Sequence, residues 1–227
     1  MTILEARQIT KTYAVGDRNI CVLDNVSVAV PAGEFLVIKG SSGSGKTTLL
    51  TLLSGLDKPS SGRILIEGRD ITDLKEDELA PLRNTTIGFV FQSFHLAPSL
   101  TAMENIMFPA ELRRDVRAEE KAEILLRRVG LIERSHNFPH QLSGGEKQRV
   151  AICRALINDP KIVFADEPTG NLDSANGKAV LELLLELQKE RQSTLVLVTH
   201  STEIAEMADR VVLLKDGKIV CDGARVH

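Results

Sequence analysis

The chain carries, at residues 40–47, the run Gly-Ser-Ser-Gly-Ser-Gly-Lys-Thr. Residues 34–39, directly before it, form a short apolar run that predicts a buried strand. After the run, leucines recur at the spacing of one helix face, which predicts a helix over residues 46–56. A strand, a glycine-rich loop and a helix in this order are typical of a phosphate-binding loop.

The residue types in this loop suit the phosphates of a nucleotide. Its glycines let the backbone curl so that successive N–H groups can face a β-phosphate. Lys46 supplies a charge that can reach the β- and γ-phosphates, and Thr47 offers a hydroxyl to Mg²⁺. The chain has no Asn-Lys-x-Asp run of the kind that recognises guanine, which favours ATP. We therefore assign to nucleotide binding Gly40, Ser41, Ser42, Gly43, Ser44, Gly45, Lys46, Thr47 and Thr48.

Two acidic residues follow a second apolar run, at residues 162–165. That run predicts a buried strand whose end presents Asp166 and Glu167. Asp166 suits contact with Mg²⁺ or its waters, and Glu167 suits a general base that polarises an attacking water. The alternative is that two adjacent acids mark a solvated turn, but the phosphate loop favours the chemical interpretation.

A third stretch reads Leu142-Ser143-Gly144-Gly145-Glu146 and precedes a predicted helix that extends to residue 157. Small residues at a helix N-terminus can form an anion site, because unpaired N–H groups point outward there. The phosphate loop lies upstream of this stretch and the Asp-Glu pair lies downstream. In this order, the three motifs make the chain resemble the ATPase subunit of an ATP-binding cassette (ABC) transporter over essentially its whole length.

The resemblance implies an α/β fold, with a RecA-like P-loop NTPase core, an antiparallel β subdomain and an inserted α-helical subdomain. We expect one ABC ATPase domain over residues 1–227, with the core at about 1–92 and 159–227 and the helical lobe at about 93–158. The sequence agrees with this layout. Alternation at residues 4–9 and 22–30 predicts antiparallel strands, and a helical pattern over residues 93–157 separates two α/β segments.

The resemblance also implies a homodimer with ATP at its interface. In this family the signature stretch, here Ser143, Gly144 and Gly145, grips the γ-phosphate of ATP bound to the opposite subunit. Two subunits then close head to tail around two ATP molecules. Asp173 matches the loop that crosses the dimer interface, and it can also act as the N-cap of the following helix.

Three further residues match positions that act on ATP in this family. Gln92 matches a glutamine that contacts Mg²⁺ or the attacking water; the alternative is an ordinary surface glutamine. His200 matches a histidine that contacts the γ-phosphate and orients the water, although a histidine at a strand end is usually structural, and Ser201 replaces the acidic residue of many relatives. Tyr13 matches an aromatic residue that stacks on adenine; the alternative is a packed strand residue.

Composition limits the partners and the location. The net charge of −3 and the pI near 6.0 give neither a basic surface for nucleic acid nor a polybasic membrane anchor. We expect no direct membrane insertion, because no apolar run approaches ~18 residues and the N-terminus does not resemble a signal peptide. The three dispersed cysteines suit a reducing cytosol. The resemblance implies a cytoplasmic protein, peripheral on the inner face of the membrane through an integral membrane permease.

Local runs at residues 40–46, 55–57, 88–92 and 165–173 resemble the LolD/MacB/YbbA-like group of lipoprotein-release and macrolide-export ATPases. This implies a permease with few membrane helices and a large extracytoplasmic domain, driven by ATP-dependent closure of the dimer. Residues 94–109 are expected to be part core and part groove for that permease. The alternatives are an amino-acid-type importer ATPase, a cell-division regulator, or an ABC ATPase acting on nucleic acid, which the acidic pI disfavours.

Overall fold

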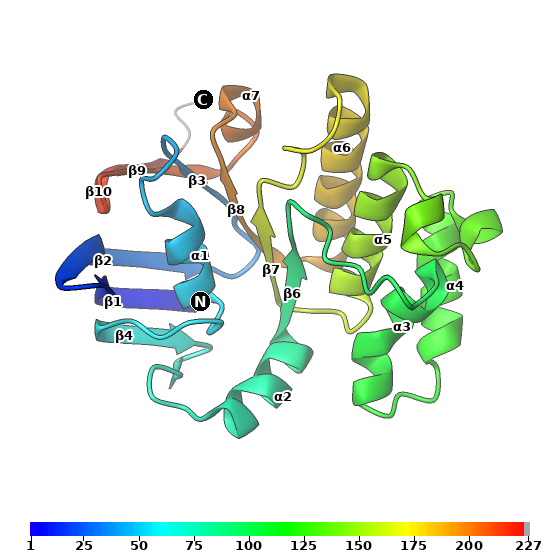
Figure 1. The fold of residues 1–227 in the computed structure, drawn as a ribbon, viewed down its shortest axis with the longest axis horizontal. Coiled ribbons are helices and arrows are strands. Elements are labelled where there is room, and N and C mark those ends of the chain that lie inside the picture. The colour runs from blue at the N-terminus through cyan, green and yellow to red at the C-terminus, as the bar shows by residue number, and fades with distance from the viewer. Residues whose placement is uncertain (225–227) are drawn as a thin grey trace. The chain divides into compact units, whose positions relative to one another are not determined.

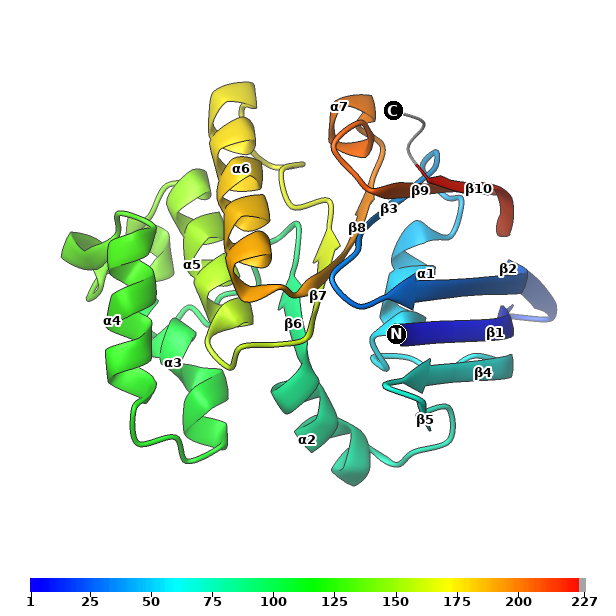
Figure 2. The same ribbon diagram turned by 180° about the vertical axis from the view of Figure 1, so that it is seen from behind.

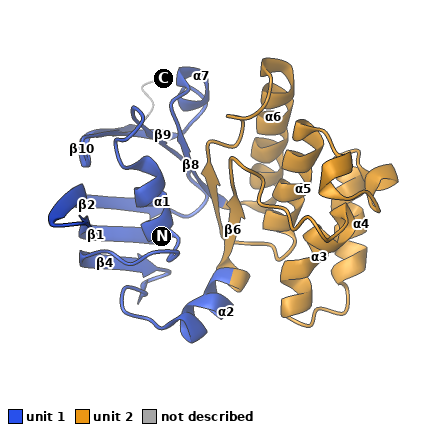
Figure 3. Ribbon diagram, in the orientation of Figure 1, with its two compact units in different colours: residues 1–83, 194–227 blue, residues 84–193 orange. Residues whose placement is uncertain are grey.

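The computed structural model describes residues 1–224. The chain divides into two compact units. Unit 1 comprises residues 1–83 and 194–227, and unit 2 comprises residues 84–193 (Figure 3). Helix α2 (Glu76–Thr86) runs through the point at which the chain leaves unit 1.

An antiparallel sheet forms the first half of unit 1. It contains β1 (Thr2–Val15), β2 (Arg18–Pro31), β4 (Ser61–Ile66) and β5 (Arg69–Asp70), in the order β2-β1-β4-β5 (Figure 1). Alternate side chains of β1 and β2 are buried, which is the pattern of a sheet with one face in a core. The predicted antiparallel pairing is confirmed. Both strands are longer than predicted, because the hairpin continues through exposed residues that break the alternation.

The second sheet segment of unit 1 carries the motif-bearing strands. It contains β3 (Phe35–Lys39), β8 (Thr194–Thr199), β9 (Arg210–Lys215) and β10 (Lys218–Ala224), in the order β10-β9-β3-β8. β3 pairs in parallel with β8 and β9, and β9 forms an antiparallel hairpin with β10. Helix α1 (Lys46–Leu53) buries its leucines, and the short helix α7 (Thr202–Ala205) follows β8.

Unit 2 combines one parallel strand pair with most of the helices. β6 (Ile87–Val90) and β7 (Ile162–Asp166) pair in parallel. The helices, which lie together in Figures 1 and 2, are α3 (Ala102–Leu112), α4 (Ala118–Arg128), α5 (Gly144–Leu156) and α6 (Ser174–Arg191). Two 3-10 turns, η1 (Ile132–Arg134) and η2 (Pro139–Gln141), connect α4 to α5.

The helices of unit 2 enclose an apolar core of their own. Buried residues from α3, α4 and α5 make up one cluster, which includes Ile106, Leu126 and Val150. α4 begins with acidic residues, ends with Arg127 and Arg128, and is followed by left-handed Gly130, as favourable helix ends require. Among residues 1–224, no helix combines the length and the apolar character that crossing a bilayer demands.

Candidate nucleotide site

The phosphate loop of unit 1 connects the carboxyl end of β3 to the first turn of α1. Gly45 is the N-cap of α1 and has a left-handed backbone, with φ of 98°. A Cβ at Gly45 would lie 2.9 Å from the backbone oxygen of Val22, so a side chain would displace the neighbouring strand. Gly43 is also left-handed, with φ of 77°. These two glycines allow the loop to curl.

Lys46 and the first turn of α1 give this loop an unsatisfied, anion-binding character. The Lys46 side chain is buried, and its Nζ donates a hydrogen bond to the backbone oxygen of Ser41 at 2.9 Å. The N-terminus of α1 has no side-chain cap, and the dipole of a helix attracts anions to this end. The hydroxyl of Ser44 is buried and has no hydrogen-bond partner among the residues described. This donor set fits a polyphosphate.

His200 lies at the same sheet edge as the phosphate loop. β3 and β8 run in parallel, with Lys39 opposite Thr199. Gly40 and His200 each follow one of these paired residues, so the strand register brings them to one edge of unit 1. His200 is exposed. Ser201, which replaces the family's acidic residue, is the N-cap of α7 and accepts a hydrogen bond from the N–H of Ile204 at 3.4 Å.

Tyr13 lies on β1 and is partly exposed, at 39%. Its hydroxyl donates a hydrogen bond to Asp57 Oδ2 at 2.8 Å. Asp57 follows α1 in the chain, so the tyrosine ring is held by the segment that leaves the phosphate-loop helix. No local pattern indicates this partner, because Tyr13 and Asp57 are 44 residues apart.

Unit 2 gathers a second group of predicted site residues at the ends of β6 and β7. These strands are parallel, with Val90 opposite Ala165. Gln92 follows the first strand, and Asp166 and Glu167 end and follow the second. Glu167 has a left-handed backbone, with φ of 42°. Such a conformation costs a non-glycine residue about 1–3 kcal/mol and is concentrated at functional sites.

Asn171 holds Gln92 within unit 2. Asn171 Nδ2 donates to the backbone oxygen of Gln92 at 3.0 Å, and Gln92 Nε2 donates to Asn171 Oδ1 at 3.4 Å. The structure thus links the predicted magnesium-sensing glutamine to the loop that carries Asp173. The sequence motifs indicate the neighbouring Asp173, whereas no local pattern indicates that Asn171 contacts Gln92.

The signature stretch begins helix α5 with a capping box. Ser143 is the N-cap, and its Oγ accepts from the N–H of Glu146 at 3.3 Å. In return, Glu146 Oε2 accepts from the N–H of Ser143 at 2.8 Å. This hydrogen bond is the main reason that the pKa of Glu146 is lowered. The pattern of a serine followed three residues later by glutamate could have predicted the capping box.

The two signature glycines allow close packing inside unit 2. A Cβ at Gly144 would lie 3.2 Å from Leu172 Cδ2, and one at Gly145 would lie 3.2 Å from Asn176 Oδ1. Asp173 is the N-cap of α6 and accepts from the N–H of Asn176 at 3.1 Å, which confirms that interpretation. Its role at a dimer interface stays a prediction.

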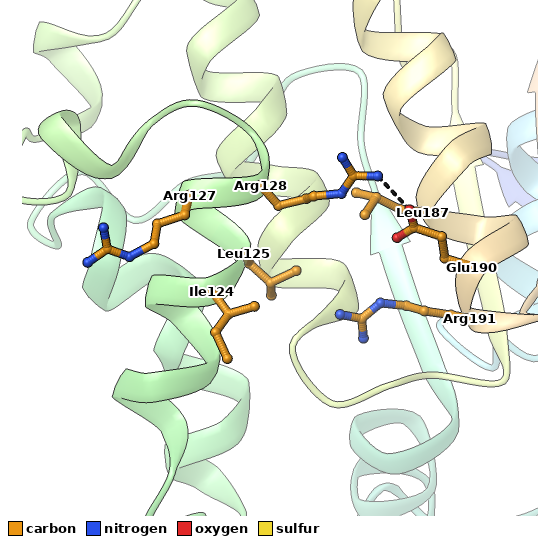
Figure 4. A pocket seen from close by; sticks show the side chains of 7 residues that line it. All are labelled: Ile124, Leu125, Arg127, Arg128, Leu187, Glu190 and Arg191. Carbon is orange, nitrogen blue, oxygen red and sulfur yellow. Dashed lines mark hydrogen bonds and ion pairs between the residues drawn. The ribbon is translucent and has the colours of Figure 1, made fainter.

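A cavity of about 480 Å³ lies elsewhere in unit 2, between α4 and α6 (Figure 4). Its lining combines apolar side chains with arginines, among them Arg128, whose guanidinium pairs with Glu186 and Glu190. Its lining does not include the predicted site residues of unit 2.

Comparisons with known proteins agree with these motifs. The model of the ABC transporter family matches residues 23–170. The macrolide export ATP-binding/permease protein MacB of Syntrophobacter fumaroxidans is 48% identical over 96% of this chain and 31% of its own length. The chain therefore spans about a third of the MacB relatives that it matches. The lipoprotein-releasing system ATP-binding protein LolD of Idiomarina loihiensis is 45% identical over 95% of both chains.

Solved structures agree as well. The structure of the ATP-binding cassette MJ0796, described as a dimeric post-hydrolysis state bound to ADP and Pi, has a TM-score of 0.91 and 40% sequence identity. The match covers 99% of this chain and 100% of the solved one. The α/β fold inferred from the motifs is thereby confirmed. The chain belongs to the ABC transporter family, as one of its ATP-binding cassettes.

Proposed function

We propose that this chain is the ATP-hydrolysing subunit of an ABC transporter of the MacB/LolD type. The observation that carries the proposal is the phosphate loop, in which two left-handed glycines, the buried Lys46 and an uncapped helix N-terminus converge. These features suit a polyphosphate. The full-length similarity to LolD, whose name describes an ATP-binding protein, supports ATP as the nucleotide.

In unit 1, we assign nucleotide binding to residues 40–48 and to Tyr13. Lys46 would exchange its bond to the Ser41 oxygen for bonds to the β- and γ-phosphates. The hydroxyl of Thr47 would bind Mg²⁺. Tyr13 would stack on the adenine ring, and His200, at the same sheet edge as the loop, would contact the γ-phosphate and orient the attacking water.

In unit 2, we assign roles in ATP hydrolysis to the residues at the ends of β6 and β7. Asp166 and Gln92 would hold Mg²⁺ or its waters, and Glu167 would accept a proton from the attacking water. Bound Mg²⁺ would neutralise phosphate charge as the bond to the leaving group breaks. The left-handed backbone of Glu167 supports this assignment, since such conformations are concentrated at functional sites.

We further propose that two copies close head to tail with ATP at the interface. Ser143, Gly144 and Gly145 would bind the γ-phosphate of ATP held by the partner copy, and Asp173 would lie at the interface. Support comes from the similarity to MJ0796, whose solved structures are described as dimeric.

The transport partner would be an integral membrane permease of the MacB/LolE kind, used for export, lipoprotein release or mechanotransmission. The name of the MacB relatives joins an ATP-binding part to a permease part, which supports such a partner. The chain would then act in the cytoplasm, peripheral on the inner membrane face. Within it, residues 93–158 would be the lobe that responds to ATP and moves the permease, and residues 1–92 and 159–227 would be the nucleotide core.

The hydrolytic role is tested with Glu167→Gln, and Glu182→Gln on the exposed face of α6 is the control. Loss of the base should lower turnover roughly 10²–10⁴-fold while ATP binding persists. Steady-state phosphate release and size-exclusion chromatography with MgATP measure turnover and dimer trapping. Wild-type turnover in Glu167→Gln would exclude the general-base role, and absence of ATP binding by the native chain would overturn the proposal.

The partner is tested by isolating Glu167→Gln with MgATP from detergent-solubilised source membranes and identifying bound proteins by mass spectrometry. A permease with few membrane helices and a large outer domain is expected. A many-helix permease would instead indicate an importer, and the absence of any membrane protein would contradict the transporter assignment.

A further inference from the structure

Asp57 connects two side chains of strand β1. Tyr13 donates its hydroxyl proton to Asp57 Oδ2 at 2.8 Å, and Lys11 Nζ donates to Asp57 Oδ1 at 2.8 Å. Lys11 also donates to the backbone oxygen of Lys58 at 2.6 Å. One carboxylate therefore fixes both the hydroxyl end of the tyrosine and the ammonium of the lysine.

Lys11 covers one face of the Tyr13 ring. Its Nζ lies over the ring, 4.8 Å from the centroid, a distance typical of a cation–π contact. Lys11 is itself buried, at 9% exposure, whereas Tyr13 keeps 39% of its surface exposed. Lys11 thus occupies one face of the ring, and part of the tyrosine remains exposed. The arrangement leaves one aromatic face for a ligand.

The same contacts tie the ring to the phosphate-loop helix. The N–H of Asp57 donates to the backbone oxygen of Thr51, on α1, at 3.2 Å. Burial, together with the bond to Asp57, raises the pKa of Tyr13, although a hydrogen bond with the Thr48 side chain opposes the rise. Tyr13 is thus a neutral donor at pH 7. Its ring is fixed relative to α1, which begins at the phosphate loop.

We propose that Asp57 is a positioning residue for nucleotide binding, which holds the Tyr13 ring by its hydroxyl so that the face away from Lys11 receives the adenine base. The inference rests on the proposed role of Tyr13 as the surface on which adenine stacks. A ring that is held before the ligand arrives loses less rotational freedom on binding. The hydroxyl, and not only the aromatic ring, should therefore contribute to affinity.

Tyr13→Phe tests this directly, because it keeps the ring and the Lys11–Asp57 pair while it removes the hydroxyl, with its bonds to Asp57 and to the Thr48 side chain. Asp57→Ala removes the same bond from the other side, and a double variant completes a cycle. Each single change should weaken ATP binding roughly three- to tenfold, as expected for one hydrogen bond to a charged group that acts indirectly. In the double variant the two losses of affinity should not add, since both single variants remove the bond between Tyr13 and Asp57.

Calorimetry with two probes separates positioning from general damage. Binding of inorganic tripolyphosphate, which has no base to stack, should be unchanged in Tyr13→Phe. In the same variant the KM for ATP should rise by a larger factor than the turnover at saturating ATP falls, since the change acts on binding. Asp70→Ala is a matched control, because Asp70 likewise accepts from a side-chain hydroxyl, that of Thr72 at 2.6 Å, and it should bind ATP normally.

The possible outcomes separate the adenine-binding role of Tyr13 from the positioning role of Asp57. If the native chain binds tripolyphosphate and ATP equally well, the adenine role of Tyr13 is wrong. If the native chain prefers ATP but Tyr13→Phe binds it with unchanged affinity, Asp57 does not position the ring. Should Asp57→Ala fail to fold, since it leaves Lys11 buried without its carboxylate, Tyr13→Phe alone decides the question, because it keeps the Lys11–Asp57 pair.

Discussion

Helices α1 and α5 both begin with glycine and serine at a predicted phosphate contact, yet their N-termini are built differently. α1 begins at Gly45, in a left-handed conformation and with no side-chain cap. α5 begins at Ser143, in an extended conformation, and a reciprocal capping box with Glu146 satisfies two of its N–H groups. The first N-terminus thus has no side-chain cap, whereas the second is capped by its own side chains.

The two helix N-termini are therefore suited to different kinds of phosphate contact. At α1, which has no side-chain cap, phosphate binding would require Lys46 to give up one internal bond, that to the Ser41 oxygen. At α5, Ser143 Oγ accepts from Glu146 N–H, which leaves the hydroxyl proton itself to donate. α1 is thus suited to hold a nucleotide by itself, and α5 to add a contact late, when a second copy presents its nucleotide.

Removal of the Lys46 ammonium should produce the largest effect. Lys46→Ala should weaken ATP binding by roughly 100-fold, because charge-assisted bonds to the phosphates are lost. Calorimetry measures the affinity, and Lys218→Ala, which breaks a surface pair with Asp24 in the same unit, is the control. Unchanged affinity in Lys46→Ala would contradict the assignment of α1 as the primary phosphate site.

An added methyl group should affect the two helix ends unequally. Gly45→Ala combines a φ of 98° with a 2.9 Å approach to a backbone oxygen, so it should destabilise the fold by about 1–3 kcal/mol. At Gly144 the methyl group would meet the movable Leu172 side chain at 3.2 Å. Gly144→Ala should therefore cost less stability. Urea unfolding measures the free energy of unfolding that each variant loses. Equal losses in the two variants would contradict this prediction.

Ser143→Ala should separate capping from catalysis. Loss of the cap should cost about 1 kcal/mol of stability. Thr101→Ala removes the equivalent cap of α3, which forms the same type of box with Glu104, and should cost a similar amount. Only Ser143→Ala should slow ATP hydrolysis, while ATP binding by the monomer stays unchanged. Equal rates of ATP hydrolysis in the two variants would show that Ser143 acts only as a structural cap.

The smallest effect concerns the pH dependence of the α5 cap. Because the pKa of Glu146 is lowered in the folded state, chiefly by the hydrogen bond from Ser143 N–H, its carboxylate contributes stability above the unfolded pKa of about 4.3. This contribution is lost as the pH falls through the lowered folded value. It should amount to roughly 0.5 kcal/mol for a partly exposed side chain at a helix N-terminus.

Glu146→Gln tests this dependence, since the amide can still complete a capping box but does not titrate. The native chain should be the more stable of the two at pH 7, and the difference in melting temperature should vanish near pH 3. A difference that persists at pH 3 would assign the effect to packing instead of charge.

The predictability of the fold differed from one element to the next. The strand predicted over residues 34–39 agrees to within one residue with β3 (Phe35–Lys39), because a short apolar run is a strong local signal of a buried strand. α1 was predicted to continue to residue 56 but ends at Leu53. Left-handed Gly55 follows its C-cap, and Leu56, counted as part of the buried face, is exposed.

The candidate site was predictable only where neighbours in sequence act together. The phosphate loop, the Asp166-Glu167 pair and the N-cap at Asp173 are all local patterns. Asp57 and Asn171 were not found, because they act on Tyr13 and Gln92 across 44 and 79 residues. Their partners depend on strand register and on turns far along the chain, and local patterns carry no information on these.

The parallel register of β3 with β8, and of β6 with β7, has a consequence for how this chain tolerates changes in length. Gly40, His200, Gln92 and Glu167 each stand within two residues of a paired strand residue. An inserted residue at these carboxyl ends would shift the reactive groups directly. At the opposite ends of the strands, as at the exposed turn Ala32-Gly33 before β3, an extra residue would lengthen a connection and leave the register intact. Natural or engineered length variation should accumulate at that other edge.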